Sequence, residues 1–295
     1  MAGFTPTAIE LILLNAVGVF SVYIVLSGGL FAFAFVVFMG IGAYAAAILA
    51  SHGHSSMLVQ ALTGIGIAAV SAMLLFLMVA RLRGIYLGIV TVGLTAIFGA
   101  LINNFPHLTG GPLGLPGVSL NVHLPALIAA VGFLCVVFAA IQHSKLGRRV
   151  KLLRTDPLVA GTLGVNVRLL SGGLFVASSV VAAFAGCLQA HYLGFVSPDS
   201  FNFTTLILFL EMAVIGGVSH WAGPIVGALV VTMIPQWLQS FQILSPVVSG
   251  AILLLTILFL PEGIVGGVLV LGRSAVIALR GEPRNGGVGT RTETR

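Results

Sequence analysis

The stretch QHSKLGRRVKLLRTDPLVAGTLGVNVR, residues 142–168, is the one long polar interval in an otherwise apolar chain. Six of the chain's thirteen Lys and Arg residues lie in it: Lys145, Arg148, Arg149, Lys151, Arg154 and Arg168. A loop this basic between apolar segments marks the cytoplasmic side of a membrane protein. The stretch therefore predicts that the sequences on both sides of it cross a membrane.

A short helix is predicted inside this loop. Asp156 followed by Pro157 is a helix-start pattern, because the carboxylate accepts hydrogen bonds at the N-cap and proline needs no donor at the first position. Gly164 supplies a left-handed stop. The helix would cover residues 157–163, about two turns, and would be too short to be stable alone. It needs a partner surface, to which it offers Leu158, Val159 and Leu163.

Composition places the whole chain in a membrane. Hydrophobic residues make up 58% of the 295 residues and charged residues 7%, and the mean hydropathy is +1.16. No soluble fold tolerates this balance without large exposed apolar patches. The predicted fold is an all-α integral membrane protein, a helical bundle of about nine transmembrane spans. The spans are expected at residues 9–26, 30–50, 57–80, 85–105, 124–141, 169–190, 204–218, 225–238 and 246–260.

The basic residues predict the orientation. With Arg81 and Arg83 inside, the fourth and fifth spans return the chain to the inside at residues 142–168, and four further spans leave the C-terminus inside. The five arginines near the C-terminus then also lie inside, so the N-terminus is expected outside. Residues 1–272 are expected to form the transmembrane domain. Residues 273–295, which lack apolar periodicity, are expected to be a disordered cytoplasmic tail.

Other classes of function are disfavoured by the same residues. The net charge of +6 is divided among separate loops, so nucleic-acid binding is not expected. A phosphate-binding loop needs Gly-Lys-Ser or Gly-Lys-Thr, but the two lysines, Lys145 and Lys151, are each followed by leucine. His52 and His54 lack a third metal ligand. We therefore expect no enzyme active site, no metal and no cofactor in this chain.

Glycine is abundant, with 38 residues, and appears in pairs spaced four apart, such as Gly84 with Gly88 and Gly223 with Gly227. Small residues at this spacing let the backbones of two membrane helices approach closely. Helix packing is therefore the expected role of both pairs.

Short motifs follow one another along the chain: Gly40-Ile41-Gly42-Ala43-Tyr44, Arg81-Leu82-Arg83-Gly84, Thr109-Gly110-Gly111-Pro112-Leu113-Gly114-Leu115, Leu163-Gly164-Val165-Asn166-Val167, Ser197-Pro198, Gly216-Gly217 and Gly223-Pro224-Ile225-Val226-Gly227-Ala228. Each motif alone is weak. In this order, over nearly the whole length, they resemble the LivM-type permeases of the branched-chain amino acid ABC transporter family.

The resemblance implies a permease subunit of an ATP-driven importer in the bacterial inner membrane, surrounded by membrane lipid. A second permease subunit would complete the pore, two cytoplasmic ATPase subunits would bind ATP, and a periplasmic solute-binding protein would deliver the solute. The short helix of the basic loop would be the coupling helix that seats in an ATPase. Its residues are Asp156, Pro157, Leu158, Val159, Ala160, Leu163 and Gly164.

The sequence departs from the family pattern in several places, two of which concern the candidate residues. The family's acidic-Ala-Ala motif is only loosely kept, since Val159 and Ala160 stand near the alanine pair and the acid is displaced to Asp156. Small and polar residues before the Gly-Ala-Tyr match are replaced by Phe31, Phe33, Phe35 and Phe38. The resemblance then implies a bulkier, more apolar translocation path, with Phe35 and Tyr44 as candidate residues.

Glu211 is the single ionisable residue well inside a predicted span. A buried carboxylate is costly in the membrane, so it should face the bundle interior. Two interpretations stay open at this point, a structural polar contact and a place on the translocation path.

Two classes of function remain. The first is the ATP-driven importer, with branched-chain amino acids as the expected solute and urea, amides or other small polar molecules as alternatives. The second is a secondary carrier or channel that works without ATPases. A carrier buries ion-coupling residues near mid-membrane, and Glu211 is the candidate for that role.

Overall fold

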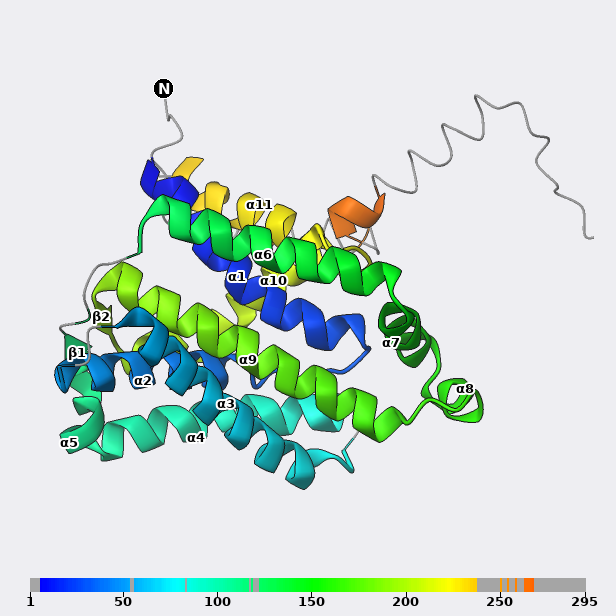
Figure 1. The fold of residues 1–295 in the computed structure, drawn as a ribbon, viewed down its shortest axis with the longest axis horizontal. Helices are drawn as coiled ribbons and strands as arrows, with labels where there is room; N and C mark the ends of the chain where they lie inside the picture. The colour runs from blue at the N-terminus through cyan, green and yellow to red at the C-terminus, as the bar shows by residue number, and fades with distance from the viewer. Residues whose placement is uncertain are drawn as a thin grey trace, which may run out of the picture.

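The computed structural model is a bundle of long helices that run roughly alongside one another (Figure 1). The structure describes residues 6–53, 56–82, 84–116, 118, 122–237, 250, 254, 258 and 263–267. His54, Arg83, most of the ninth predicted span and the predicted tail, residues 273–295, lie outside the described residues.

Eight helices correspond to the first eight predicted spans. They are α1 (Pro6–Ser27), α2 (Phe35–Ser51), α3 (Met57–Val79), α4 (Ile85–Asn104), α6 (Leu124–His143), α9 (Val167–Leu193), α10 (Phe203–Gly216) and α11 (Gly223–Trp237). Within the described residues, five of these are long and apolar enough to cross a membrane, namely α1, α3, α4, α6 and α9. The prediction of an all-α membrane protein is therefore confirmed.

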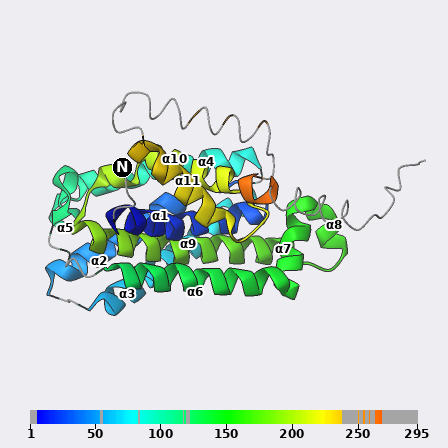
Figure 2. The same ribbon diagram turned by 90° about the horizontal axis from the view of Figure 1, so that it is seen from above.

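Short elements connect these helices at the two ends of the bundle. They are α5 (Pro106–Thr109), η1 (Gly111–Leu113), β1 (Leu115–Pro116), α7 (Lys145–Thr155), α8 (Pro157–Thr162), β2 (Phe195–Val196) and η2 (Pro198–Phe201). Helices α7 and α8 project at one end, called the loop end, whereas α5, β1 and β2 lie at the opposite end, called the strand end (Figures 1 and 2). Helix α1 begins at the strand end.

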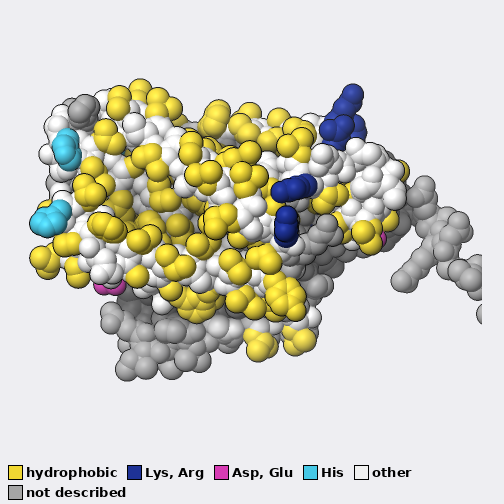
Figure 3. All heavy atoms as spheres, turned by 90° about the horizontal axis from the view of Figure 1, so that it is seen from below, with side chains coloured by type: hydrophobic (Ala, Val, Ile, Leu, Met, Phe, Trp, Pro, Cys, Tyr) yellow, Lys and Arg dark blue, Asp and Glu magenta, His cyan; other side chains and the backbone are white. Residues whose placement is uncertain are grey.

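The surface between the two ends is apolar. Figure 3 shows one face covered by hydrophobic and uncharged atoms, with Lys and Arg side chains gathered toward one end and His side chains at the other. Large exposed side chains on α3 and α4 include Leu62, Val70, Ile89 and Ile97. An apolar belt between polar ends is what a membrane-embedded surface requires.

Helix α9 lies at the centre of the bundle and packs against α1, α2 and α3. Its contact with α2 is backbone to backbone. A Cβ atom added at Gly186 would overlap the carbonyl oxygen of Met39, and one added at Gly42 would overlap the carbonyl oxygen of Ala183. Without a hydrophobic driving force between helices in lipid, such close approach of small residues supplies the packing.

At the strand end, two loops that are far apart in the sequence pair with each other. Strand β1 is antiparallel to β2, with Leu115 opposite Val196 and Pro116 opposite Phe195. Gly114, at φ +72°, precedes β1, and a Cβ atom there would overlap the carbonyl oxygen of Val196. The pairing joins the connection after α4 to the connection after α9.

The start of the second predicted span is wrong. Helix α2 begins at Phe35, and residues 30–34 form an irregular segment after the turn at Gly29, whose φ is +73°. In this segment the Phe33 backbone N–H donates to Thr91 Oγ1 of α4 at 2.9 Å. Apolar composition requires burial but does not specify a helix. Here the Thr91 hydroxyl takes the place of the backbone carbonyl that would accept from the Phe33 N–H in a helix.

One of the two predicted glycine pairs does not pack helix backbones together. Gly84 has φ +56° and caps α4, with nothing within 4 Å of a Cβ atom there, and Gly88 lies against the Phe33 side chain. Gly223 and Gly227 are confirmed as packing residues, because Cβ atoms there would overlap the carbonyl oxygens of Gly217 and Met212. The spacing alone did not separate a backbone-conformation role from a packing role.

Candidate functional site

The predicted short helix of the basic loop is present as α8. The Asp156 carboxylate caps its start, because Oδ1 accepts hydrogen bonds from the backbone N–H groups of Leu158 at 2.8 Å and Val159 at 3.2 Å. Pro157 occupies the first turn. The N-cap and proline pattern is therefore confirmed as a helix start.

The end of α8 is also fixed by local rules. Gly164 has φ +77°, and the Val165 N–H donates to the Ala160 carbonyl at 3.1 Å while the Gly164 N–H donates to the Gly161 carbonyl at 3.1 Å. This pair of bonds is the Schellman arrangement, which satisfies carbonyls left open at a helix C-terminus. The helix ends at Thr162, and Leu163 is its C-cap rather than its last residue.

The aliphatic side chains of α8 point in two directions. Leu158 is 75% exposed, Val159 45% and Leu163 66%, whereas Ala160 is fully buried. Three exposed aliphatic side chains on so short a helix form an apolar surface that a partner can cover. Ala160 instead faces away from solvent, so it does not belong to that exposed surface.

The cap at Asp156 gives the first prediction. Asp156→Ala should destabilise α8 by about 1 kcal/mol, because two backbone donors lose their acceptor. Hydrogen exchange at the Leu158 and Val159 amides should then accelerate. Thr162→Ala, at the other end of the helix, is the control, since its hydroxyl bonds only to the Val159 carbonyl; equal acceleration in both variants would contradict the capping role.

Helix α7 connects α8 to the bundle and is itself capped. Ser144 Oγ accepts from the Leu146 N–H at 3.1 Å and the Gly147 N–H at 3.4 Å. A cleft of about 290 Å³ separates α7 from the turn that follows α8. It is lined by Lys145, Arg148, Arg149, Leu152, Leu163 and Val165. The loop end thus presents a positively charged cleft beside the exposed aliphatic side chains of α8.

Two hydrogen bonds join this loop to the turn between α10 and α11. Arg154 Nη1, at the end of α7, donates to the Val218 carbonyl at 3.2 Å. The Trp221 N–H donates to Gln142 Oε1 at the end of α6, at 3.3 Å. Arg154 also lies against the turn after α1, because a Cβ atom at Gly29 would be 3.1 Å from its Cα. Displacement of α7 and α8 is thereby connected to two other turns at the loop end.

His220 lies in the same turn. Burial, and to a smaller extent the nearby His143, lower the pKa of His220 from its ordinary value of 6.5. A lowered pKa keeps the imidazole neutral at pH 7. The stability that this neutral form contributes is present above the ordinary pKa and is lost as the pH falls through the lowered value.

Arg154 gives the second prediction. Arg154→Ala should leave the chain folded but should weaken the connection between α7 and the α10–α11 turn. The bond runs between a charged donor and an exposed carbonyl, so we expect a loss of about 1 kcal/mol. Hydrogen exchange in residues 217–222 measures it. Arg149→Ala, an exposed neighbour of like charge for which the structure shows no such bond, should leave that turn unchanged.

The three candidate residues for the translocation path lie in separate places. Phe35 is buried against Phe209 of α10, with ring centroids 6.1 Å apart. Tyr44 is buried against Phe98 of α4 and Phe201 of η2. Glu211 on α10 is 9% exposed, as expected for an acid that faces the bundle interior. All three side chains are thus buried in the bundle interior, two on α2 and one on α10.

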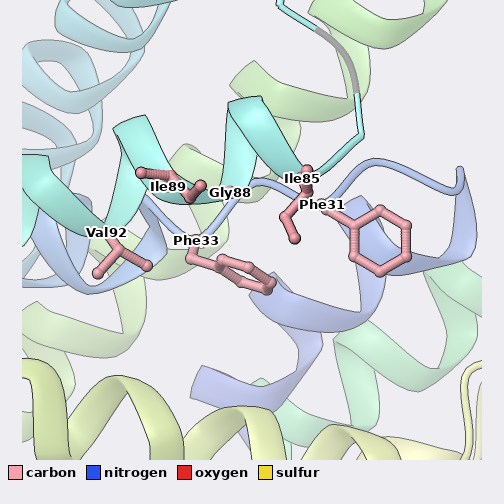
Figure 4. Close-up of a pocket in the computed structure, with 6 residues that line it drawn as sticks. All are labelled: Phe31, Phe33, Ile85, Gly88, Ile89 and Val92. Atoms are coloured by element: carbon pink, nitrogen blue, oxygen red, sulfur yellow. The ribbon is translucent and has the colours of Figure 1, made fainter.

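Two of the four phenylalanines that replace the family's small and polar residues, Phe31 and Phe33, line a hollow at the loop end. It has a volume of about 520 Å³ and is lined by Phe31, Phe33, Ile85, Gly88, Ile89 and Val92 (Figure 4). None of these side chains is polar, so the hollow suits only an apolar group. Burial of Phe33 and Gly88 against each other explains why the segment before α2 lies on α4.

The chain matches the family model described as branched-chain amino acid transport system, permease component, over residues 7–259. It is 29% identical over 263 residues to the high-affinity branched-chain amino acid transport system permease protein LivM of Escherichia coli (strain K12). That match covers 77% of this chain and 61% of the relative.

Two further relatives match over about half of their length. The high-affinity branched-chain amino acid transport system permease protein LivH of Escherichia coli (strain K12) is 30% identical over 148 residues, 48% of this chain and 47% of LivH. The fructose import permease protein FrcC of Rhizobium meliloti is 26% identical over 176 residues, 54% of this chain and 48% of FrcC. No solved structure matches the chain. Because the family model extends over all the long helices of the bundle, the chain belongs to the family of permease components of branched-chain amino acid transport systems.

Proposed function

We propose that this chain is a permease subunit of an ABC importer that carries branched-chain amino acids across the bacterial inner membrane. The observation that carries the proposal is α8, a capped helix that projects at the basic end of a permease-family bundle and exposes Leu158, Val159 and Leu163. A second permease subunit would complete the pore. Two cytoplasmic ATPase subunits would bind and hydrolyse ATP, and a periplasmic solute-binding protein would deliver the solute.

In this proposal α8 is the coupling helix, and its residues have three roles. Asp156, Pro157 and Gly164 fix its length, Ala160 holds it to the bundle, and the exposed aliphatic side chains enter a groove of the ATPase. The adjacent basic cleft favours acidic side chains on that partner. Movement of an ATPase would displace α8, and Arg154 and Gln142 would carry the displacement to the α10–α11 turn.

The proposed topology has nine spans, with the N-terminus outside and the C-terminus inside. Its support is the distribution of charge: Arg81 follows α3, the large basic cluster lies on α7, and Arg168 begins α9, all of which are at the loop end. Helix α1 begins at the opposite end. If the loop end is cytoplasmic, as basic loops are, the strand end faces the solute-binding protein.

The solute is proposed from the relatives, since the matched permeases LivM and LivH are named for branched-chain amino acids. The match to a fructose import permease supports other small polar molecules as alternative solutes, with urea and amides among them. Phe35, Tyr44 and Glu211 are proposed to lie along the path. Among them, Tyr44 is the one that lies beside the strand end's connections.

Purification and reconstitution test this function. The chain, expressed with its neighbouring subunits, should co-purify with an ATPase, and proteoliposomes should take up leucine only when ATP and the solute-binding protein are present. An ion gradient without ATP should drive no uptake. Leucine uptake driven by an ion gradient with no ATPase bound would overturn the importer and establish a secondary carrier.

A further inference from the structure

Within the part of the chain that the structure describes, two buried hydroxyl groups on membrane-spanning helices have no hydrogen-bond partner. Tyr44 on α2 is 5% exposed and Thr95 on α4 is 4% exposed. Neither Tyr44 Oη nor Thr95 Oγ1 has a partner among the described residues. A polar atom buried in this way costs free energy, so each calls for an explanation.

The helices that carry the two hydroxyl groups meet at Phe98. The ring of Tyr44 lies 6.4 Å from the ring of Phe98, which is one helical turn beyond Thr95 on α4. Gly40 lies one turn before Tyr44 on α2, and a Cβ atom there would overlap the Phe98 ring. Tyr44 and Thr95 therefore lie on the faces of α2 and α4 that meet. We call this place the α2–α4 seam, formed by Gly40, Tyr44, Thr95 and Phe98.

An irregular segment closes the seam from the strand end. Element η2 is a single 3-10 turn that packs against both α2 and α4. Its Phe201 is 2% exposed, and the ring lies 6.3 Å from the Tyr44 ring. Helix α10, which follows η2, has 14 residues, fewer than a full span needs. Many transporters bind solute where short helices leave irregular backbone inside the bundle.

A carboxylate stands at the entrance of the seam. Asp199 of η2 is exposed, and it is close enough to the Tyr44 hydroxyl for an electrostatic interaction between them. The seam thus has hydroxyl groups inside, aromatic rings around them and one negative charge at its entrance. This set matches an amino acid, whose carboxylate accepts hydrogen bonds, whose ammonium group pairs with an acid, and whose apolar side chain packs on rings.

Thr91, one turn before Thr95 on the same helix, shows that the open hydroxyl is not a general property of α4. Thr91 Oγ1 donates to carbonyls of its own helix, at 2.7 Å to Leu87 and 2.9 Å to Gly88, and accepts from the Phe33 N–H. Threonine hydroxyl groups in helices commonly bond in this way to a carbonyl one turn earlier. The side chain of Thr95 does not, and its Oγ1 remains without a bond at the seam.

We propose that the α2–α4 seam is the outer solute site of the permease and is shut in this structure. When α2 and α4 separate, Tyr44 Oη and Thr95 Oγ1 donate to the carboxylate of an α-amino acid, Asp199 receives its ammonium group, and Phe98 and Phe201 enclose an aliphatic side chain. This assignment rests on the proposed import function. It adds the groups that recognise the solute and the helices that part to admit it.

Removal of the two hydroxyl groups tests the site. In the complete transporter reconstituted in proteoliposomes, Tyr44→Phe and Thr95→Val should each lower leucine uptake about tenfold or more, since a hydrogen bond to a charged group is lost. Neither change should lower the Tm, because the hydroxyl groups are unpartnered when the seam is shut. Tyr23→Phe, which removes a buried phenol hydroxyl on α1, is the matched control and should transport normally.

A labelling experiment tests the opening. In a chain whose Cys135 and Cys187 are replaced by alanine, Thr95→Cys should react slowly with a membrane-impermeant thiol reagent added outside. The reaction should become at least about tenfold faster when ATP and the solute-binding protein are present, because only an opened seam exposes that position. Leucine, when added, should slow it again.

The outcomes separate this inference from the proposed function. If the wild-type transporter takes up no leucine with ATP, the proposed function fails. If the wild type transports leucine and Tyr44→Phe and Thr95→Val do so equally well, the seam is not the solute site. Loss of uptake together with a lowered Tm would show that the hydroxyl groups serve packing, and this would also overturn the site.

Discussion

Replacing Gly186 with valine should remove nearly all folded protein from the membrane. The Gly186 Cα faces the carbonyl oxygen of Met39, and α2 and α9 touch through their backbones at this point. A side chain there cannot move aside by changing rotamer, because the atoms that it meets belong to a helix backbone. We expect a loss of about 3 kcal/mol or more from overpacking, seen as a lost monodisperse peak when detergent-solubilised protein is analysed by size exclusion.

Gly173 on the same helix is the matched control. Nothing lies within 4 Å of a Cβ atom there, so Gly173→Val changes the same residue type by the same volume without meeting the backbone of another helix. It should give a peak like that of the wild type. Normal yield and Tm for Gly186→Val would show that α2 and α9 are not in contact at this position.

Leu158→Asp should abolish ATP-driven uptake while the bundle stays folded. The side chain is 75% exposed on α8, so the bundle loses little when it becomes polar. If α8 enters an apolar groove of an ATPase, the aspartate brings an unpaired charge into that groove, a change that typically costs several kcal/mol. Loss of the ATPase from the purified complex, measured as its ratio to the permease, is the direct readout.

The control for this variant places the same change at the opposite end of the molecule. Leu108 on α5 is 61% exposed at the strand end, and Leu108→Asp should leave the ATPase bound. Gly164→Pro should act like Leu158→Asp, because proline cannot adopt the φ of +77° that ends α8. ATPase retention in both loop variants would exclude α8 as the coupling helix.

Local features of the basic loop were readable from the sequence. Asp156, Pro157 and Gly164 act on the backbone within a few residues of themselves, and the structure confirms the helix that they predicted. The apolar runs likewise predicted the long helices, since each run has to satisfy its backbone inside the membrane. Predictions of this kind need only the neighbouring sequence.

Features that depend on distant segments were not readable. The hydrogen bond from Arg154 to Val218 joins residues that are 64 positions apart, and neither local sequence predicts it. Thr95 looked like any threonine in a span, and its open hydroxyl is visible only once α2 and α4 are placed together. The irregular start of α2 was missed because the residues before Phe35 are as apolar as the helix.

The pairing of β1 with β2 makes one lid from two loops that lie on opposite halves of the sequence. Element η2 begins two residues after β2, and its Phe201 ring lies 6.3 Å from the Tyr44 ring. A partner protein that binds and displaces these strands would therefore move Phe201 and Tyr44 in the bundle interior without inserting any part of itself into the membrane.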